Sequence, residues 1–145
     1  MLENKLLRII DANLNRAREG LRVCEDIARF SLENKSVTKS LKATRHSATD
    51  LILKSKKISL AGLLSGRDIS SDKTKFIDFR PGEETGISDI FMANIERVKE
   101  SLRVLEECFK PVDEKISRGY RKLRFDAYDI EKSVVKKAGL ISCNR

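Results

Sequence analysis

The sequence is poor in the residues on which many binding and catalytic sites depend. It has no tryptophan, two tyrosines, one histidine and three cysteines among 145 residues. The cysteines show no metal-ligand spacing, which argues against a structural zinc site. The scarcity of aromatic side chains leaves little for base stacking, so it disfavours recognition of single-stranded nucleic acid.

Helix breaks and long apolar runs are also scarce. Two prolines and seven glycines beside 36% charged residues are typical of a helical soluble protein. No apolar run approaches the roughly 18 residues of a membrane span. The N-terminal residues 1–16 are amphipathic and carry acids, unlike a signal or transit peptide. We therefore expect a single helical domain over residues 1–145, a cytoplasmic location and no membrane partner.

Common catalytic motifs are missing as well. The sequence has no Gly-rich phosphate loop ending in Lys-Ser/Thr, no GxSxG and no HExxH. An enzyme would therefore have to use arginine, acids and the one histidine on helices. The net charge of +8 suits either nucleic acid or small anions. Because many lysines are interleaved with acids, we favour small anions over nucleic acid and keep a basic RNA-binding bundle as a further alternative.

One stretch of the sequence occurs twice. Residues 12–26 (ANLNRAREGLRVCED) return at 93–107 as ANIERVKESLRVLEE, with eight of fifteen positions identical. Apolar spacing alone would preserve a helix, yet Asn, Arg and Glu return in register too. The pattern indicates a duplicated unit whose polar residues have a function.

The apolar spacing predicts four helices, at residues 2–32, 36–56, 88–110 and 113–137. Ser36 is the expected N-cap of the second helix. Arg45 corresponds to Arg124, so the repeat extends over a whole helical hairpin, 2–56 and 88–137.

We predict an all-α fold, an antiparallel four-helix bundle built from two duplicated helical hairpins related by a pseudo-twofold axis. Exposed edges of the apolar stripes suggest a homodimer. The joining loop, residues 57–87, is unusually long and holds four of the seven glycines. Such a loop suits a lid over a site, and a plain crossover linker is the alternative.

Asn13 and Glu25 are the polar residues that this helical geometry places beside the core, where charge acts strongly. Arg22, Glu25 and Asp26 follow an i, i+3, i+4 spacing, which by itself also fits surface ion pairs. The return of the glutamate as Glu106 favours a functional site over that alternative. His46 corresponds to Phe125, so it marks a difference between the hairpins.

Several of these stretches together resemble one known family: residues 13–26 and 94–107, Arg45-His46, and Arg67-Asp68 with Asp72. They resemble the strictly monofunctional hydroxymethylpyrimidine-phosphate kinases of thiamin biosynthesis. That helical module is often fused in front of a thiamin-phosphate synthase barrel and sometimes stands alone. After Asp72 the family usually continues with Val-Gly-Thr, whereas this chain has residues 73–75 as Lys-Thr-Lys.

The resemblance implies ATP-dependent phosphorylation of 4-amino-5-hydroxymethyl-2-methylpyrimidine phosphate to its diphosphate, with ATP and Mg²⁺ as cofactors. The small-molecule partners would be this phosphorylated pyrimidine and a nucleotide, and a separate thiamin-phosphate synthase chain could be a protein partner. The alternative is a non-catalytic helical module that docks onto, or oligomerises with, such a synthase. No synthase activity is expected of this chain itself.

On chemical grounds, carboxylates would take the metal and arginines the phosphates. The expected catalytic residues are Arg22, Glu25, Asp26 and Glu106, with Mg²⁺ on Glu25 and Asp26. The expected substrate-binding residues are Asn13, Arg16, Arg45, His46, Arg67, Asp68, Asn94, Arg97 and Arg103. The kinase interpretation expects the polar repeat residues to face one shared cleft, whereas the docking interpretation expects a broad apolar outer patch.

Overall fold

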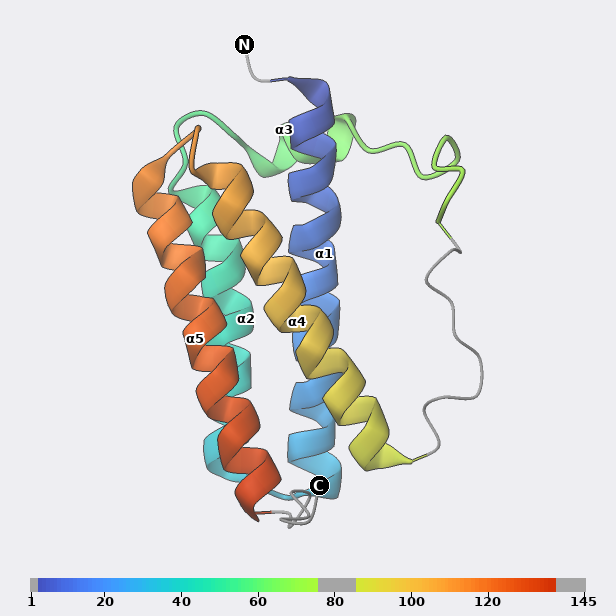
Figure 1. Ribbon diagram of the computed structural model, residues 1–145, viewed down its shortest axis with the longest axis vertical. Coiled ribbons are helices and arrows are strands. Elements are labelled where there is room, and N and C mark those ends of the chain that lie inside the picture. The colour runs from blue at the N-terminus through green and yellow to red at the C-terminus, as the bar shows by residue number, and fades with distance from the viewer. Residues whose placement is uncertain (1–2, 76–85, 138–145) are drawn as a thin grey trace.

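The computed structural model describes residues 3–75 and 86–137, and all regular secondary structure in these ranges is helical (Figure 1). The four long helices are α1 (Asn4–Asp26), α2 (Lys35–Leu53), α4 (Ile87–Phe109) and α5 (Glu114–Lys137). One π-helical turn, η1 (Ile27–Ser31), extends α1, and a short helix, α3 (Leu60–Ser65), follows α2. The predicted all-α fold is confirmed.

The long helices form a four-helix bundle in which every neighbouring pair is antiparallel. Helices α1 and α5 run in one direction, and α2 and α4 run in the other (Figure 1). The main contacts join α1 to α4, α4 to α5, α1 to α2 and α2 to α5, so the helices stand at the corners of a square. Within the described ranges, no helix is both long and apolar enough to cross a lipid bilayer. Superposition of the two hairpins stays a prediction.

The predicted apolar stripes form the core of the bundle. Buried residues of the first stripe are Ile10, Leu14, Ala17, Leu21, Cys24 and Ala28, and those of the second are Phe91, Ile95, Val98, Leu102, Leu105 and Phe109. Asn13 and Glu25 are buried at the edge of this core, as expected. The hydroxyl of the fully buried Tyr120 donates a hydrogen bond to the Ala48 carbonyl oxygen at 2.7 Å, so burial leaves it paired.

Gly20 lies where α1 and α4 approach each other closely. A Cβ atom added at Gly20 would lie 2.8 Å from Val98 Cγ2 and 3.2 Å from the Asn94 carbonyl oxygen. Its repeat counterpart, Ser101, is also small and buried. Close helix packing therefore explains why a glycine interrupts an otherwise regular helical pattern.

Two helix ends have features that the sequence analysis did not predict. The N-cap of α2 is Asn34, whose side chain accepts a hydrogen bond from the Val37 backbone N–H at 3.1 Å, so the prediction of Ser36 as the cap was wrong. Asn34 takes the role because its carboxamide oxygen reaches the free N–H groups of the first turn. The first helix ends in the π-turn, in which the Leu32 N–H donates to the Ile27 carbonyl oxygen at 3.0 Å.

The long connection has a topological reason. Helix α2 ends at the end of the bundle where α1 begins, and α4 begins at the opposite end (Figure 1). The chain must therefore travel the length of α4, about 35 Å for a helix of this size. Helix α3 lies within the stretch predicted as loop. Ser59 caps it by accepting a hydrogen bond from the Gly62 N–H, and Leu63 is buried. The lid prediction also falls on residues 76–85, which lie outside the described residues.

Candidate functional site

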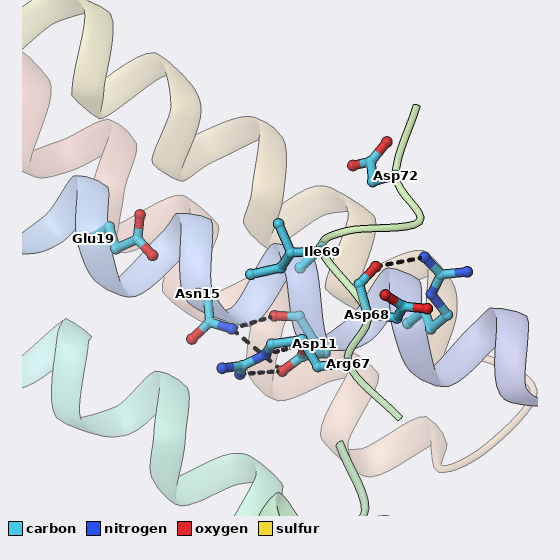
Figure 2. Close-up of a pocket in the computed structure, with 9 residues that line it drawn as sticks. Asp11, Asn15, Glu19, Arg67, Asp68, Ile69 and Asp72 are labelled. Carbon is cyan, nitrogen blue, oxygen red and sulfur yellow. Dashed lines mark hydrogen bonds and ion pairs between the residues drawn. The ribbon is translucent and has the colours of Figure 1, made fainter. Parts of the chain in front are cut away.

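A polar groove runs along the outer side of α1 and consists of two adjoining pockets. The first, which we call the connector pocket, has a volume of about 300 Å³ and lies between α1 and residues 67–72 (Figure 2). Its lining residues are Arg8, Asp11, Ala12, Asn15, Glu19, Arg67, Asp68, Ile69 and Asp72. The second, the arginine pocket, has a volume of about 550 Å³ and is lined by Asn15, Arg18, Glu19, Arg22 and Arg45.

The two pockets adjoin because Asn15 and Glu19 line both, and together they form what we call the α1 groove. Arg8, Asn15 and Arg22 are spaced by seven residues and therefore lie on one face of the helix. From Arg8 to Arg22 this face is about 21 Å long, at 1.5 Å per residue. The groove is long enough to hold two small ligands end to end.

Asp11 and Arg67 form the centre of the connector pocket. The Arg67 Nε and Nη2 atoms donate to the two Asp11 carboxylate oxygens, each at 2.8 Å (Figure 2). Asn15 Nδ2 donates to the Asp11 carbonyl oxygen at 3.0 Å. Two parallel hydrogen bonds of this kind fix both position and angle, so the pair holds residues 67–72 against α1. Arg8 adds a hydrogen bond from Nη2 to the Asp68 carbonyl oxygen at 3.3 Å.

The Asp68 carboxylate organises the turn that forms the pocket wall. It accepts hydrogen bonds from Ser71 Oγ, from Ser70 Oγ at 2.9 Å and from the Ser71 N–H at 3.2 Å. These hydrogen bonds, led by that from the Ser71 hydroxyl, hold the pKa of Asp68 below its usual value. Asp68 therefore lines the predicted site, and its charge also stabilises the turn that shapes it.

In the arginine pocket, a buried glutamate orients an arginine from the next helix. Arg45 Nε donates to Glu25 Oε2 at 3.0 Å, and Arg45 Nη2 donates to Oε1 at 3.5 Å. Arg22 is exposed, and its ion pairs with Glu25 and Asp26 are longer, at 3.7 Å each. Three guanidinium groups, including that of Arg18, thus border one open pocket, an arrangement suited to phosphate.

The second hairpin contains an equivalent buried carboxylate. Glu106 accepts hydrogen bonds from Arg124 Nη2 at 2.9 Å and from Arg121 Nε at 3.0 Å. Burial raises the pKa of Glu106, but these hydrogen bonds outweigh it and hold the pKa below its usual value. Because α1 and α4 are antiparallel, Glu25 and Glu106 lie toward opposite ends of the bundle (Figure 1). The expectation that they share one cleft was wrong.

The structure divides the predicted site residues into two groups. Arg22, Arg45, Arg67 and Asp68 line the α1 groove, and Glu25 and Asp26 border it through Arg22. The others do not line either pocket: Arg16, His46 and Asn13 in the first hairpin, and Asn94, Arg97, Arg103 and Glu106 in the second.

The repeated asparagines have the same local role in both hairpins. Asn13 Nδ2 donates to the Ile9 carbonyl oxygen at 2.9 Å, and Asn94 Nδ2 donates to the Ile90 carbonyl oxygen at 2.8 Å. Each amide thus pairs with the backbone of its own helix. His46 is exposed on α2 next to Arg45.

The carboxylates of the α1 groove would suit an Mg²⁺ ion that is bound together with phosphate groups. They would suit less well an ion that is bound by protein side chains alone. No group of three or more His, Cys, Asp or Glu side chains in residues 3–75 and 86–137 is placed to hold a metal. Glu25 is already engaged by Arg45. Asp26 and Glu19 offer more accessible carboxylates at the groove. Mg²⁺ often binds through one or two carboxylates together with substrate phosphates, and this donor set matches that pattern.

Sequence reasoning missed Arg8, Asp11, Asn15, Arg18 and Glu19. The repeat drew attention to positions that the hairpins share, whereas several groove residues occupy positions at which the hairpins differ. Asp11, for example, corresponds to Met92, and Asn15 corresponds to Glu96. For Asp11, the available signal was a charged residue whose counterpart in the second hairpin is apolar.

The chain is similar to known proteins over most of its length. The model of the ThiD2 family matches residues 8–133. Thiamine-phosphate synthase of Prochlorococcus marinus is 35% identical over 140 residues, which cover 95% of this chain and 38% of the relative. The synthase of Nostoc punctiforme is 33% identical over 135 residues, covering 92% of this chain and 36% of the relative.

A third relative, the thiamine-phosphate synthase of Rhodopirellula baltica, is 33% identical over 142 residues, covering 97% of this chain and 37% of the relative. This chain therefore spans little more than a third of the length of these curated relatives. No solved structure shows a significant match. With a family match over most of its length, the chain belongs to the ThiD2 family.

Proposed function

We propose that this chain phosphorylates hydroxymethylpyrimidine phosphate to its diphosphate with ATP as the donor. The family match and the relatives named thiamine-phosphate synthase support a role in thiamin biosynthesis. The α1 groove is the observation that carries the kinase proposal. It combines arginines that can bind phosphate with accessible carboxylates, over a length that suits two ligands.

The groove residues would act mainly by positioning and by neutralising charge, which is most of what phosphoryl transfer requires. Arg22 and Arg45 would hold phosphate oxygens, and Glu25 would keep the Arg45 guanidinium oriented. Arg67, fixed by Asp11, would contact the second ligand in the connector pocket. A Mg²⁺ ion held by phosphates and by Glu19 or Asp26 would supply further neutralisation of the transferring group.

The proposal is tested by incubating the purified chain with ATP, Mg²⁺ and the pyrimidine monophosphate. ADP is followed by a coupled assay, and the diphosphate is identified by phosphorus NMR. We expect Arg22→Gln to lower kcat/KM by about a hundredfold, the effect of some 2.7 kcal/mol in the transition state. Arg118→Gln removes the same charge from an exposed position on α5 and serves as the matched control.

Absence of a diphosphate product from the unmodified chain would contradict the kinase proposal. An equal loss of kcat/KM in the Arg22 and Arg118 variants would instead show that the active site does not lie in the α1 groove. Both variants alter exposed side chains, so circular dichroism should show unchanged helicity.

The docking alternative is favoured by a different observation. The chain spans little more than a third of its relatives, so in those proteins the matching region is accompanied by much further sequence. In this alternative the chain binds a thiamin-phosphate synthase and transfers no phosphate. Calorimetry with a purified synthase tests it, and a tight complex without any kinase product would support it.

A further inference from the structure

The two hairpins differ at the positions that form the arginine pocket. Its residues Asn15, Arg18, Glu19, Arg22 and Arg45 correspond in the second hairpin to Glu96, Lys99, Glu100, Arg103 and Arg124. The first set has three arginines and one carboxylate. The second set has three cations and two carboxylates, and a further acid, Glu131, joins it from α5.

In the second hairpin, the residue equivalent to Arg18 is Lys99, and its charge is paired with carboxylates of the same chain. Lys99 is buried and forms ion pairs with Glu96 and, at 2.5 Å, with Glu131. Its Nζ lies 4.6 Å from the centre of the Tyr128 ring. Burial lowers the pKa of Lys99, but the hydrogen bonds that Lys99 donates to Glu131 and Glu96 outweigh this effect and raise the pKa above its usual value. Lys99 is therefore positively charged, and Glu96 and Glu131 neutralise that charge.

Arg124, the equivalent of Arg45, is also more fully engaged. Its Nε and Nη2 atoms both donate to Glu106 Oε1, at 3.2 and 2.9 Å, and its guanidinium lies 4.9 Å from the centre of the Phe125 ring. In the first hairpin an exposed histidine, His46, replaces that phenylalanine.

The first hairpin keeps its cations accessible. Arg18 is exposed, lines the pocket and has no ion-pair partner in the part of the chain that the structure describes. The Arg22 side chain is more than half exposed, and its ion pairs with Glu25 and Asp26 are long, at 3.7 Å. Arg45 is held at the floor of the pocket by Glu25. Glu25 and Asp26 are the partners of Arg22 and Arg45, and Glu19 is the carboxylate that lines the pocket. The exposed guanidinium of Arg18 therefore brings to the pocket a positive charge that no ion pair within residues 3–75 and 86–137 neutralises.

We infer that Arg18, Arg22 and Arg45 form a single polyphosphate-binding subsite, and that the second hairpin contains no equivalent. The inference rests on the proposed function and refines it. The arginine pocket would take the triphosphate of the nucleotide, because several guanidinium groups suit a chain of phosphates. The connector pocket, with its mixed charges, is then left for the phosphorylated ring.

Binding of ATP and of inorganic tripolyphosphate, measured by isothermal titration calorimetry, tests the inference without any turnover. We expect one site per chain for each ligand. Arg18→Gln should weaken both affinities by about tenfold or more, because tenfold is the lower end of the usual contribution of a hydrogen bond to a charged group. Arg118→Gln, which removes the same charge elsewhere, should change them less than twofold. Both residues are exposed, so folding is expected to be retained.

The possible outcomes separate this inference from the kinase proposal. Two equal sites per chain, no binding of tripolyphosphate, or equal losses in both variants would overturn the subsite. Binding that depends on Arg18 in a chain that forms no diphosphate would sustain the subsite and reject the kinase. Diphosphate formation that is unaffected by Arg18→Gln would sustain the kinase and reject the subsite.

Discussion

At the scale of single residues, the most consequential feature is a buried carboxylate held by arginine in each hairpin. Glu25 is paired with Arg45, and Glu106 is paired with Arg124 and Arg121. These pairs explain in structural terms why the same Glu and Arg occur in both copies of the repeat, since each pair joins two neighbouring helices at the edge of the core. Removing one partner of a buried pair leaves the other charge uncompensated.

The substitution Glu106→Gln should lower the free energy of unfolding by about 3 kcal/mol, because Arg124 would lose its charged partner while still largely buried. Urea denaturation followed by circular dichroism measures the change. Glu107→Gln is the control, because that neighbouring carboxylate is exposed and should contribute little. Equal stabilities for the two variants would mean that the Glu106 pair is not structural.

The same comparison has a defined pH dependence. The pKa of Glu106 lies below its usual value of 4.5 in the folded chain, so its ionised form favours folding. The stability that it contributes is complete well above pH 4.5 and is lost as the pH falls through the lower, folded-state pKa. The difference in melting temperature between the unmodified chain and Glu106→Gln should therefore be constant from pH 6 to 8 and shrink below about pH 4.5. A difference that grows on acidification would contradict this assignment.

At the scale of helices, two glycines mark close approaches of different kinds. A Cβ at Gly20 would meet a methyl group of Val98 and a backbone oxygen of α4. A Cβ at Gly119 would meet only the end of the Leu51 side chain, 2.5 Å from Cδ2. Valine is stiff at χ1 and backbone cannot easily withdraw, whereas a leucine end can rotate.

Alanine substitutions at the two glycines should therefore act in opposite directions. Gly20→Ala should destabilise the chain by about 1–2 kcal/mol, because overpacking outweighs the gain in helix propensity. Gly119→Ala should be neutral or stabilise by up to about 1 kcal/mol, because Leu51 is only partly buried and can move. Midpoints of urea denaturation give both values, and a stabilised Gly20 variant would show that α1 and α4 can separate without cost.

At the scale of the whole molecule, the connection from α2 to α4 combines two tasks. It carries the chain from one end of the bundle to the other, because α2 and α4 run in the same direction (Figure 1). It also supplies Arg67 and the turn around Asp68, which form one wall of the connector pocket. A single connection can therefore both cross the bundle and line a pocket, and the lid stays a prediction.

Deletion of residues 60–75 should separate these tasks. The remaining connection, residues 54–59 and 76–86, could still reach roughly 55 Å when extended, more than the length of α4. We expect the helical circular dichroism spectrum to persist, with a lower melting temperature because buried Leu63 is lost. Turnover in the kinase assay should fall to background, and turnover that survived would show that the connector pocket is not part of the site.

The sequence alone was sufficient to predict the four long helices, their inward faces and the bundle, but not the short helix α3. Apolar periodicity is a local property, and Ile10, Leu14 and Leu21 follow it without reference to the rest of the chain. The placement of Asn13 and Glu25 at the edge of the core follows from the same helical geometry. The repeat also identified Arg22 and Arg45, two of the arginines that line the groove.

Only the tertiary structure decided which charges meet. Glu25 and Arg45 are 20 residues apart, and Asp11 and Arg67 are 56 residues apart, so no local pattern links either pair. The antiparallel packing of α1 and α4 sent Glu25 and Glu106 toward opposite ends of the bundle, although their sequence contexts are nearly the same. The described part of the connector then formed a pocket against α1 of the first hairpin. Duplicated sequence specifies equivalent helices, whereas a site also depends on what packs beside each copy.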